Sequence, residues 1–180
     1  MTGQHISQVV LDCLQNGRSV KIDGLGVFKR GSNGKFHFEP QTALRVFLAY
    51  VDEDAEKVFE LFNALENSGF APWMDKKKLL AGQNWPRAIE KAIRTADVFV
   101  PCYSRRALQK KGRFQSEVRF ALKCGDLQPM ESTFVMPVRL EDCTVPAMIA
   151  ESIQFIDLFP RAQEGVQQLA KALWASRRVL

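Results

Sequence analysis

Hydrophobic and polar positions follow two patterns that alternate along most of the chain, one typical of buried strands and one typical of amphipathic helices. Residues 45–50 form a nearly continuous apolar run, which predicts a central parallel strand. Residues 55–65 then place apolar side chains three and four positions apart, which predicts a helix. The same alternation continues to the end of the chain, with further strands expected at residues 70–74, 97–102, 134–138 and 154–158.

Five strands separated by helices predict an α/β fold, in which a five-stranded parallel sheet in flavodoxin-like order carries helices on both faces. Pro72 lacks a backbone N–H, so its strand is expected at an edge of the sheet. Asp52 and Asn84 are expected to cap the helices that follow them, and Pro86 suits a first helical turn. Residues 141–149 show no regular period, which predicts irregular structure with at most one helical turn.

The first 43 residues follow a different pattern and are expected to form a segment of their own, ahead of a domain over residues 44–180. Apolar residues from Ile6 to Leu14 recur at helical spacing, and Gly17 follows as a stop signal. Short segments of period two, separated by bends at residues 24–26 and 31–34, predict strands at residues 19–23, 27–30 and 35–39. We therefore predict a small helix followed by a β-ribbon.

Composition narrows the classes of function. The chain has 180 residues, of which 46% are hydrophobic and 25% are charged, as in ordinary globular proteins. The net charge of +5 is compatible with phosphate-bearing ligands. Apolar runs are far shorter than the roughly 20 residues of a membrane span, and the first residues lack a secretion signal, so a cytoplasmic location without membrane contact is expected. The 4 cysteines are scattered and both histidines precede residue 44, so no metal site is expected.

One carboxylate has an unusual place in the pattern. The helix after the third strand carries an apolar stripe made of Phe114, Val118, Ala121 and Leu122. Glu117 falls inside or just beside this stripe, past the carboxyl end of a strand, where open α/β sheets place their ligands. The alternative is a partly buried structural glutamate paired with Arg113, one turn earlier, and spacing alone favours this alternative.

Three blocks of sequence resemble a known family. They are residues 46–50 followed by Asp54, residues 69–75 followed by 79–85, and residues 96–104 followed by 112–117. In this order and at this spacing they are similar to the Toll/interleukin-1 receptor (TIR) domain, of the kind common in bacteria. The resemblance covers residues 45 to about 176 and implies either of two activities: cleavage of NAD⁺ between nicotinamide and ribose, or assembly with further TIR domains to transmit a signal.

In the cleaving members the essential residue is a glutamate on the helix after the third strand, and Glu117 occupies that position. By the same resemblance, the residues expected to line the substrate pocket are Ala49, Tyr50, Asp75, Trp85 and Ser104. Cleaving members often carry an aromatic residue, commonly tryptophan, just before the glutamate, and the candidates here are Arg113 and Phe114. Residues 75–84 match the family's mobile loop, which shapes both the pocket and the assembly contacts.

A single carboxylate is enough for this reaction. Nicotinamide leaves a cationic ring as a neutral molecule and needs no proton donor, whereas ordinary glycosides need two carboxyl groups. The anion stabilises an oxocarbenium-like transition state, and the reaction ends in hydrolysis or in cyclisation to an ADP-ribose product. NAD⁺ is then the substrate, no separate cofactor is expected, and the implied role is that of an antiviral defence effector or signal producer in bacteria.

Two other interpretations stay open. The chain could be a non-catalytic TIR interaction module that self-associates through the loop at residues 75–84, with or without an activating partner protein or ligand. A third interpretation is DNA binding through the N-terminal ribbon, whose basic residues Lys21, Lys29, Arg30 and Lys35 could contact phosphates. Residues 9–38 also resemble the middle of the HU/IHF family of DNA-binding proteins through the segments 16–22 and 24–28. The long arginine-rich arm that grips DNA in that family is missing, so the resemblance does not extend to nucleic-acid binding.

Overall fold

In the computed structural model the chain divides into two compact units, residues 1–43 and residues 44–180, which are described separately. The structure describes residues 3–22, 26–31, 34–40, 42–75, 84–129 and 131–176. Most of the long loop expected at residues 75–84, with its three lysines, lies outside the described residues, as do the centres of the two bends expected in the first 43 residues.

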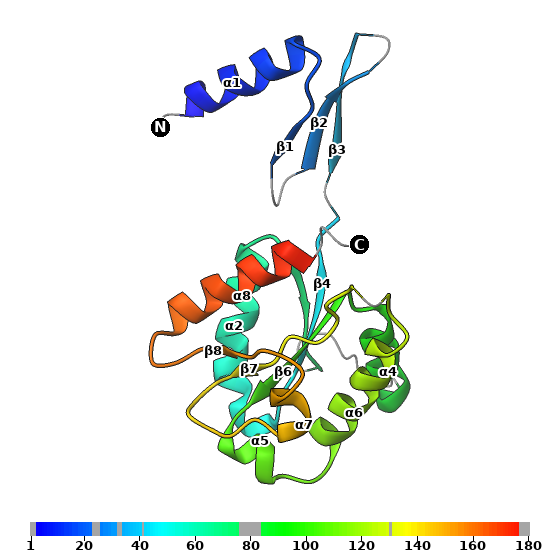
Figure 1. Cartoon of the computed structure of the whole chain (residues 1–180), viewed down its shortest axis with the longest axis vertical. Coiled ribbons are helices and arrows are strands. Elements are labelled where there is room, and N and C mark those ends of the chain that lie inside the picture. The colour runs from blue at the N-terminus through cyan, green and yellow to red at the C-terminus, as the bar shows by residue number, and fades with distance from the viewer. Residues whose placement is uncertain are drawn as a thin grey trace. The chain divides into compact units, whose positions relative to one another are not determined.

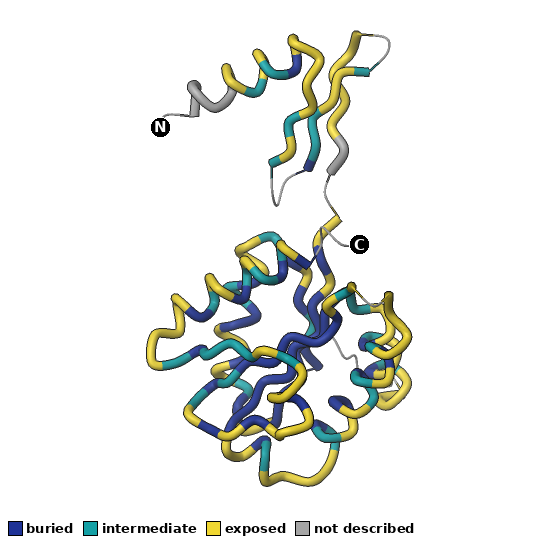
Figure 2. Tube along the Cα trace, in the orientation of Figure 1, coloured by how far each residue is buried: buried dark blue, intermediate teal, exposed yellow. Residues whose placement is uncertain are grey.

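The first unit is a helix followed by a three-stranded antiparallel sheet in the order β1-β2-β3 (Figure 1). Its elements are α1 (Gly3–Gln15), β1 (Val20–Ile22), β2 (Gly26–Arg30) and β3 (Phe36–Pro40). Phe28 and Phe38 face each other across β2 and β3, with ring centroids 4.6 Å apart. Much of this unit is exposed (Figure 2), including Phe36, which keeps 48% of its surface accessible. The predicted helix and ribbon are confirmed.

The second unit alternates strands and helices as the sequence predicts. Its elements are β4 (Arg45–Ala49), the 3-10 turn η1 (Asp52–Asp54), α2 (Ala55–Asn67), β5 (Ala71–Trp73), α4 (Trp85–Thr95), β6 (Val98–Tyr103), α5 (Arg105–Gln109), α6 (Arg113–Gly125), β7 (Val138–Arg139), α7 (Ala147–Ala150), β8 (Ile156–Asp157) and α8 (Ala162–Ser176). The five strands are parallel, in the order β5-β4-β6-β7-β8. This order confirms the flavodoxin-like arrangement and the edge position of the strand that contains Pro72.

The sheet of the second unit separates two hydrophobic layers, because successive side chains of a strand point to opposite faces. Val46 and Leu48 of β4 pack with α2 and α8, whereas Phe47 and Ala49 pack with α4, α6 and α7. The buried strands run through the centre of this unit in Figure 2. None of the helices within the described ranges is long and apolar enough to cross a membrane.

Two local predictions are wrong, and one short helix was missed. Asp52 does not cap α2; it begins the 3-10 turn η1, in which the Asp54 N–H donates to the carbonyl of Val51 over 2.9 Å. Helix α5, which begins directly after Ser104, was not predicted. The fourth strand pairs only at β7, preceded by a single bridge at Val135, since Pro137 has no N–H with which to continue the ladder.

Candidate active site

The carboxyl ends of the first two parallel strands bring two polar side chains together. Tyr50 directly follows β4, and Asp75 comes two residues after the end of β5. The Tyr50 hydroxyl donates a short hydrogen bond to a carboxylate oxygen of Asp75, and both residues are buried. This pair lies at the carboxyl-terminal edge of the sheet, where open α/β folds bind ligands.

Arg113, the first residue of α6, connects this wall to Glu117. Its Nη2 lies 2.6 Å from Oδ2 of Asp75 and 3.8 Å from Oδ1 of Asp52. Its Nε lies 3.4 Å from Oε1 of Glu117, so the pairing one helical turn apart that the sequence predicts is present. The guanidinium also stacks against Trp85 at the start of α4, with Cζ 5.2 Å from the ring centroid.

Glu117 lies on the buried side of α6, among Phe114, Val118 and Ala121, because its position falls within the helix's apolar stripe. Only 8% of its surface is exposed. Burial raises the pKa of Glu117 to about 7; Arg113 opposes this shift, and the negative charges of Asp75 and Asp52 add to it. The carboxyl group therefore titrates near neutral pH, as many catalytic carboxyl groups do.

Glu117 opens onto a cavity of about 220 Å³ between α4 and α6. Its lining consists of Trp85, Pro86, Ile89, Glu90, Ile93, Arg113, Ser116, Glu117 and Phe120. A water molecule occupies about 30 Å³, so the cavity is about seven waters in size. That space is enough for one six-membered ring with a small substituent, and it is smaller than the roughly 300–1,000 Å³ of pockets for drug-sized ligands.

The predicted site residues fall into two groups. Trp85, Arg113 and Glu117 line the Glu117 cavity, and Tyr50 and Asp75 are connected to it through the ion pair between Asp75 and Arg113. Ala49 and Ser104 do not border the Glu117 cavity. Ser104 is fully buried; its hydroxyl donates to Asp54 and accepts from the Ala107 N–H over 3.0 Å, and it thereby caps α5. Their part in substrate binding stays a prediction.

Of the two candidates to replace the family's aromatic residue, Arg113 borders the Glu117 cavity. Phe114 points into the core, where its ring meets that of Tyr103 edge-on at 5.6 Å. It borders a neighbouring cavity of about 50 Å³, which Arg113, Tyr50 and Asp52 also line. Arg113 thus forms a wall that the two cavities share.

Six of the lining residues were not predicted as site residues: Pro86, Ile89, Glu90, Ile93, Ser116 and Phe120. They border the cavity because α4 packs against α6, with the Arg94 guanidinium 4.8 Å from the centroid of the Phe120 ring. Glu90 directly follows Ile89 of the predicted inner face of this helix, and this position could have indicated that Glu90 lies near the cavity. The contact between the two helices is tertiary and leaves no periodic signal in the sequence.

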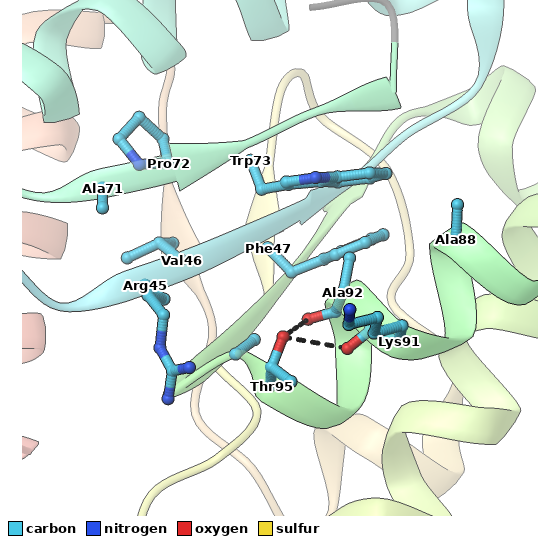
Figure 3. Close-up of a pocket in the computed structure, with 11 residues that line it drawn as sticks. Arg45, Val46, Phe47, Ala71, Pro72, Trp73, Ala88, Lys91, Ala92 and Thr95 are labelled. Atoms are coloured by element: carbon cyan, nitrogen blue, oxygen red, sulfur yellow. Dashed lines mark hydrogen bonds between the residues drawn. The ribbon is translucent and has the colours of Figure 1, made fainter. Parts of the chain in front are cut away.

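A larger cavity, of about 440 Å³, lies on the other side of α4 and is lined mostly by apolar residues (Figure 3). Its floor is apolar, with Trp73 stacked on Phe47 at 4.6 Å. Of its polar lining residues, Arg45 forms a bidentate ion pair with Asp97, and the Thr95 hydroxyl donates to the Lys91 carbonyl over 2.9 Å. No carboxylate is among the described residues that line this cavity, so the Glu117 cavity is the candidate active site.

Comparisons with known proteins agree with this architecture. A family model described as TIR domain matches residues 46–170. The TIR domain of the Toll-related receptor TRR-2 from Hydra magnipapillata is 18% identical, with 71% of this chain and 96% of that chain covered and a TM-score of 0.59. The TIR domains of the activated Roq1 resistosome, which recognises the effector XopQ, are 20% identical, with 73% and 99% covered and a TM-score of 0.58.

A third structure, the TIR-STING receptor of C. gigas in complex with 2',3'-cGAMP, is 18% identical, with 69% of this chain and 39% of that chain covered and a TM-score of 0.54. A comparison with curated proteins gave no match. At these identities the structures establish the fold alone. Because the family model spans more than half of the chain, the protein belongs to the TIR domain family.

Proposed function

We propose that this protein is a NAD⁺ nucleosidase that cleaves the nicotinamide–ribose bond, with Glu117 as the catalytic carboxylate. TIR domains include both NAD⁺-cleaving enzymes and signalling modules. The observation that carries the choice is Glu117 itself, which is almost completely buried, has its pKa raised to about 7, and borders a cavity large enough for one ring.

In this mechanism the nicotinamide ring enters the cavity between α4 and α6, whose apolar residues exclude water around it. The ionised Glu117 holds the ribose hydroxyls and stabilises the positive charge that develops on the ribose. The bond between the ribose anomeric carbon and the ring nitrogen breaks, and its electron pair neutralises the ring. Water, or a nucleophile within the substrate, then adds to the anomeric carbon and releases a proton, which gives hydrolysis or cyclisation.

Bound substrate also favours the ionised carboxylate. An opposite charge within about 4–6 Å lowers the pKa of a carboxyl group. The cationic ring therefore helps to keep the carboxylate of Glu117 ionised while the substrate is bound.

The test is product analysis by mass spectrometry after incubation of the purified protein with NAD⁺. Glu117→Gln should reduce nicotinamide release about 100-fold or more, in line with the loss of a charge-stabilising group. Glu60→Gln is the matched control, since Glu60 is an exposed glutamate on α2 and does not line the cavity. Equal release by wild type and Glu117→Gln would contradict the proposal, as would no release by concentrated wild-type protein under crowding.

A second candidate function is assembly without catalysis. The Roq1 structure consists of TIR domains within an assembled resistosome, and the Arg113–Glu117 ion pair gives Glu117 a structural role that needs no substrate. In that case Glu117→Gln leaves signalling intact, whereas substitutions in residues 76–83 abolish it. For either function we propose a bacterial antiviral defence role in which self-association and an activating partner control the protein; this proposal rests on the family.

A further inference from the structure

We infer that Arg113 holds the place of a planar aromatic cation in the Glu117 cavity and must move aside when such a ring binds. The ligand class is an N-substituted pyridinium. The identification of that ring with the nicotinamide of a substrate rests on the proposed function, but the inference about the cavity and its arginine does not.

The contacts of Arg113 are those that a pyridinium ring would make. Its guanidinium is planar, carries one delocalised positive charge, and lies over the ring of Trp85 in a cation–π contact, with Cζ 5.2 Å from the ring centroid. Its Nε lies 3.4 Å from the carboxylate of Glu117. A pyridinium is also flat, singly charged and weakly hydrated, so the same aromatic face and the same carboxylate would attract it.

The rest of the cavity suits a cation better than an anion. Its charged lining residues in the described part of the chain are Glu90, Glu117 and Arg113. The remaining walls are mostly apolar, with Ile89, Ile93 and Phe120 around the space. Once the guanidinium moves out, two carboxyl groups and an aromatic face border the cavity, and a cation can restore the balance of charge.

The guanidinium of Arg113 has a second set of partners outside the Glu117 cavity. Its Nη2 lies 2.6 Å from Asp75 and 3.8 Å from Asp52. Asp75 is held in position by the hydroxyl of Tyr50, and Arg113 also lines the smaller cavity on that side. The guanidinium can therefore rotate away from Trp85 and Glu117 while its ion pair with Asp75 persists.

This exchange would also discriminate between substrate and product. A cationic ring replaces both interactions that Trp85 and Glu117 make with Arg113, so displacement of the guanidinium is compensated. A neutral ring keeps the stacking but loses the attraction to the carboxylate. When the bond to ribose breaks and the ring becomes neutral, Arg113 returns to Glu117 and favours release of the product.

The experiment measures binding rather than turnover. Trp85 is 55% exposed, so its fluorescence should be quenched by the 1-methylnicotinamide cation, and Trp85→Phe identifies its share of the signal. In a titration series between pH 7 and pH 10, at the high-pH limit where Glu117 is ionised in both proteins, Arg113→Gln should bind this cation about tenfold more tightly than wild type, since one competing cation–π contact and one ion pair are gone. The affinity for neutral nicotinamide should differ by less than about twofold between the two proteins.

Arg113→Lys serves as the matched variant, because lysine keeps the charge for Asp75 but has no planar group to stack on Trp85. It should bind the cation with an affinity between those of wild type and Arg113→Gln. If Arg113→Gln does not fold, tighter cation binding by Arg113→Lys than by wild type is the test of the inference. Unchanged or weaker cation binding in the folded variants would overturn the inference, as would an equal gain for neutral nicotinamide.

The two proposals fail separately. Tighter cation binding by Arg113→Gln in a protein that releases no nicotinamide from NAD⁺ would reject the nucleosidase and keep the role of Arg113. Nicotinamide release that depends on Glu117, together with cation binding that does not change in Arg113→Gln, would support the nucleosidase and reject the role of Arg113.

Discussion

At the scale of single residues, the protonation of Glu117 is set by two opposing effects. Burial raises its pKa, and Arg113, whose Nε lies 3.4 Å from the carboxylate, lowers it. The pair is predictable from the sequence, because residues four apart meet on a helix. The contact between Arg113 and Trp85 is not predictable in this way, since it depends on how α4 packs against α6.

The first prediction concerns the pH dependence of the reaction. If ionised Glu117 is the catalytic form, kcat/KM for NAD⁺ should rise with pH through about 7 in the wild type. Arg113→Gln removes the positive charge that lowers this pKa, so the rise should move to higher pH. Profiles of nicotinamide release between pH 5 and 9 measure both curves, and a shift toward lower pH would contradict this account.

The second prediction links the same group to stability. In the folded protein the pKa of Glu117 is raised from 4.5 to about 7, so between these pH values the folded state binds more protons than the unfolded state. Stability from this group is therefore present below about pH 4.5 and lost as pH rises toward 7. Across that range Glu117 should lower the free energy of unfolding by up to about 3 kcal/mol.

Urea unfolding of wild type and Glu117→Gln at pH 4.5 and pH 8 measures this effect. Glutamine has no titrating proton, so the stability of the variant relative to wild type should increase from the lower to the higher pH. The two proteins differ in other contacts as well, but those contacts contribute equally at both pH values. A constant difference between the proteins would mean that the carboxyl group titrates normally.

At the scale of elements, Ser104 shows how a residue chosen for function can serve structure. The end of β6 turns directly into α5, and Ser104 occupies the N-cap with its hydroxyl accepting from the Ala107 N–H. The same hydroxyl donates to the buried carboxylate of Asp54 at the end of η1. One side chain thus joins the segment after β4 to the segment after β6, which are 50 positions apart in the sequence.

The third prediction is that Ser104→Ala lowers stability more than it affects catalysis. Loss of the cap costs about 0.5–2 kcal/mol, and a buried Asp54 without this donor adds about 1–3 kcal/mol. Urea unfolding should show the loss, while kcat/KM for NAD⁺ in the folded variant stays within about twofold. Ser104→Thr, which keeps the hydroxyl, is the control. A large change in KM without loss of stability would instead support the predicted place of Ser104 in the pocket.

Element positions were predictable to different degrees. β4 and α6 have long apolar patterns, and their predicted positions are confirmed within a residue or two. The fourth strand was predicted too early, because the apolar residues at 134–136 are buried without forming a regular ladder. α5 spans only Arg105–Gln109, too few residues for a helical period to stand out.

At the scale of the molecule, the parallel sheet followed from the alternation of strand and helix, since parallel strands need helical crossovers. The flavodoxin-like strand order was expected for a domain of this size and is confirmed. The two main hydrophobic clusters lie entirely within residues 44–180. In the first unit, by contrast, Val9, Leu11, Phe36 and Phe38 remain exposed. Size accounts for this difference, because a segment of this length has too few residues to enclose a core.

The fourth prediction is that residues 44–180 fold without the first unit. Removal of residues 1–43 takes away no member of either hydrophobic cluster, so the shortened protein should unfold cooperatively in urea and keep its Glu117-dependent activity. The full chain and the shortened chain should also be compared for DNA binding at two salt concentrations. Tight, salt-dependent binding by the full chain alone would support the DNA-binding interpretation of residues 1–43.

The two edges of the parallel sheet limit how copies of this protein can associate. One edge is β5, three residues long with Pro72 at its centre, and the other is β8, only two residues long. A short strand, or one that lacks a backbone N–H, is a poor template for a further strand. Growth into amyloid-like fibrils by strand addition is therefore disfavoured. An ordered assembly of these domains would have to form through side chains on helices and loops, where contacts can be selective and reversible.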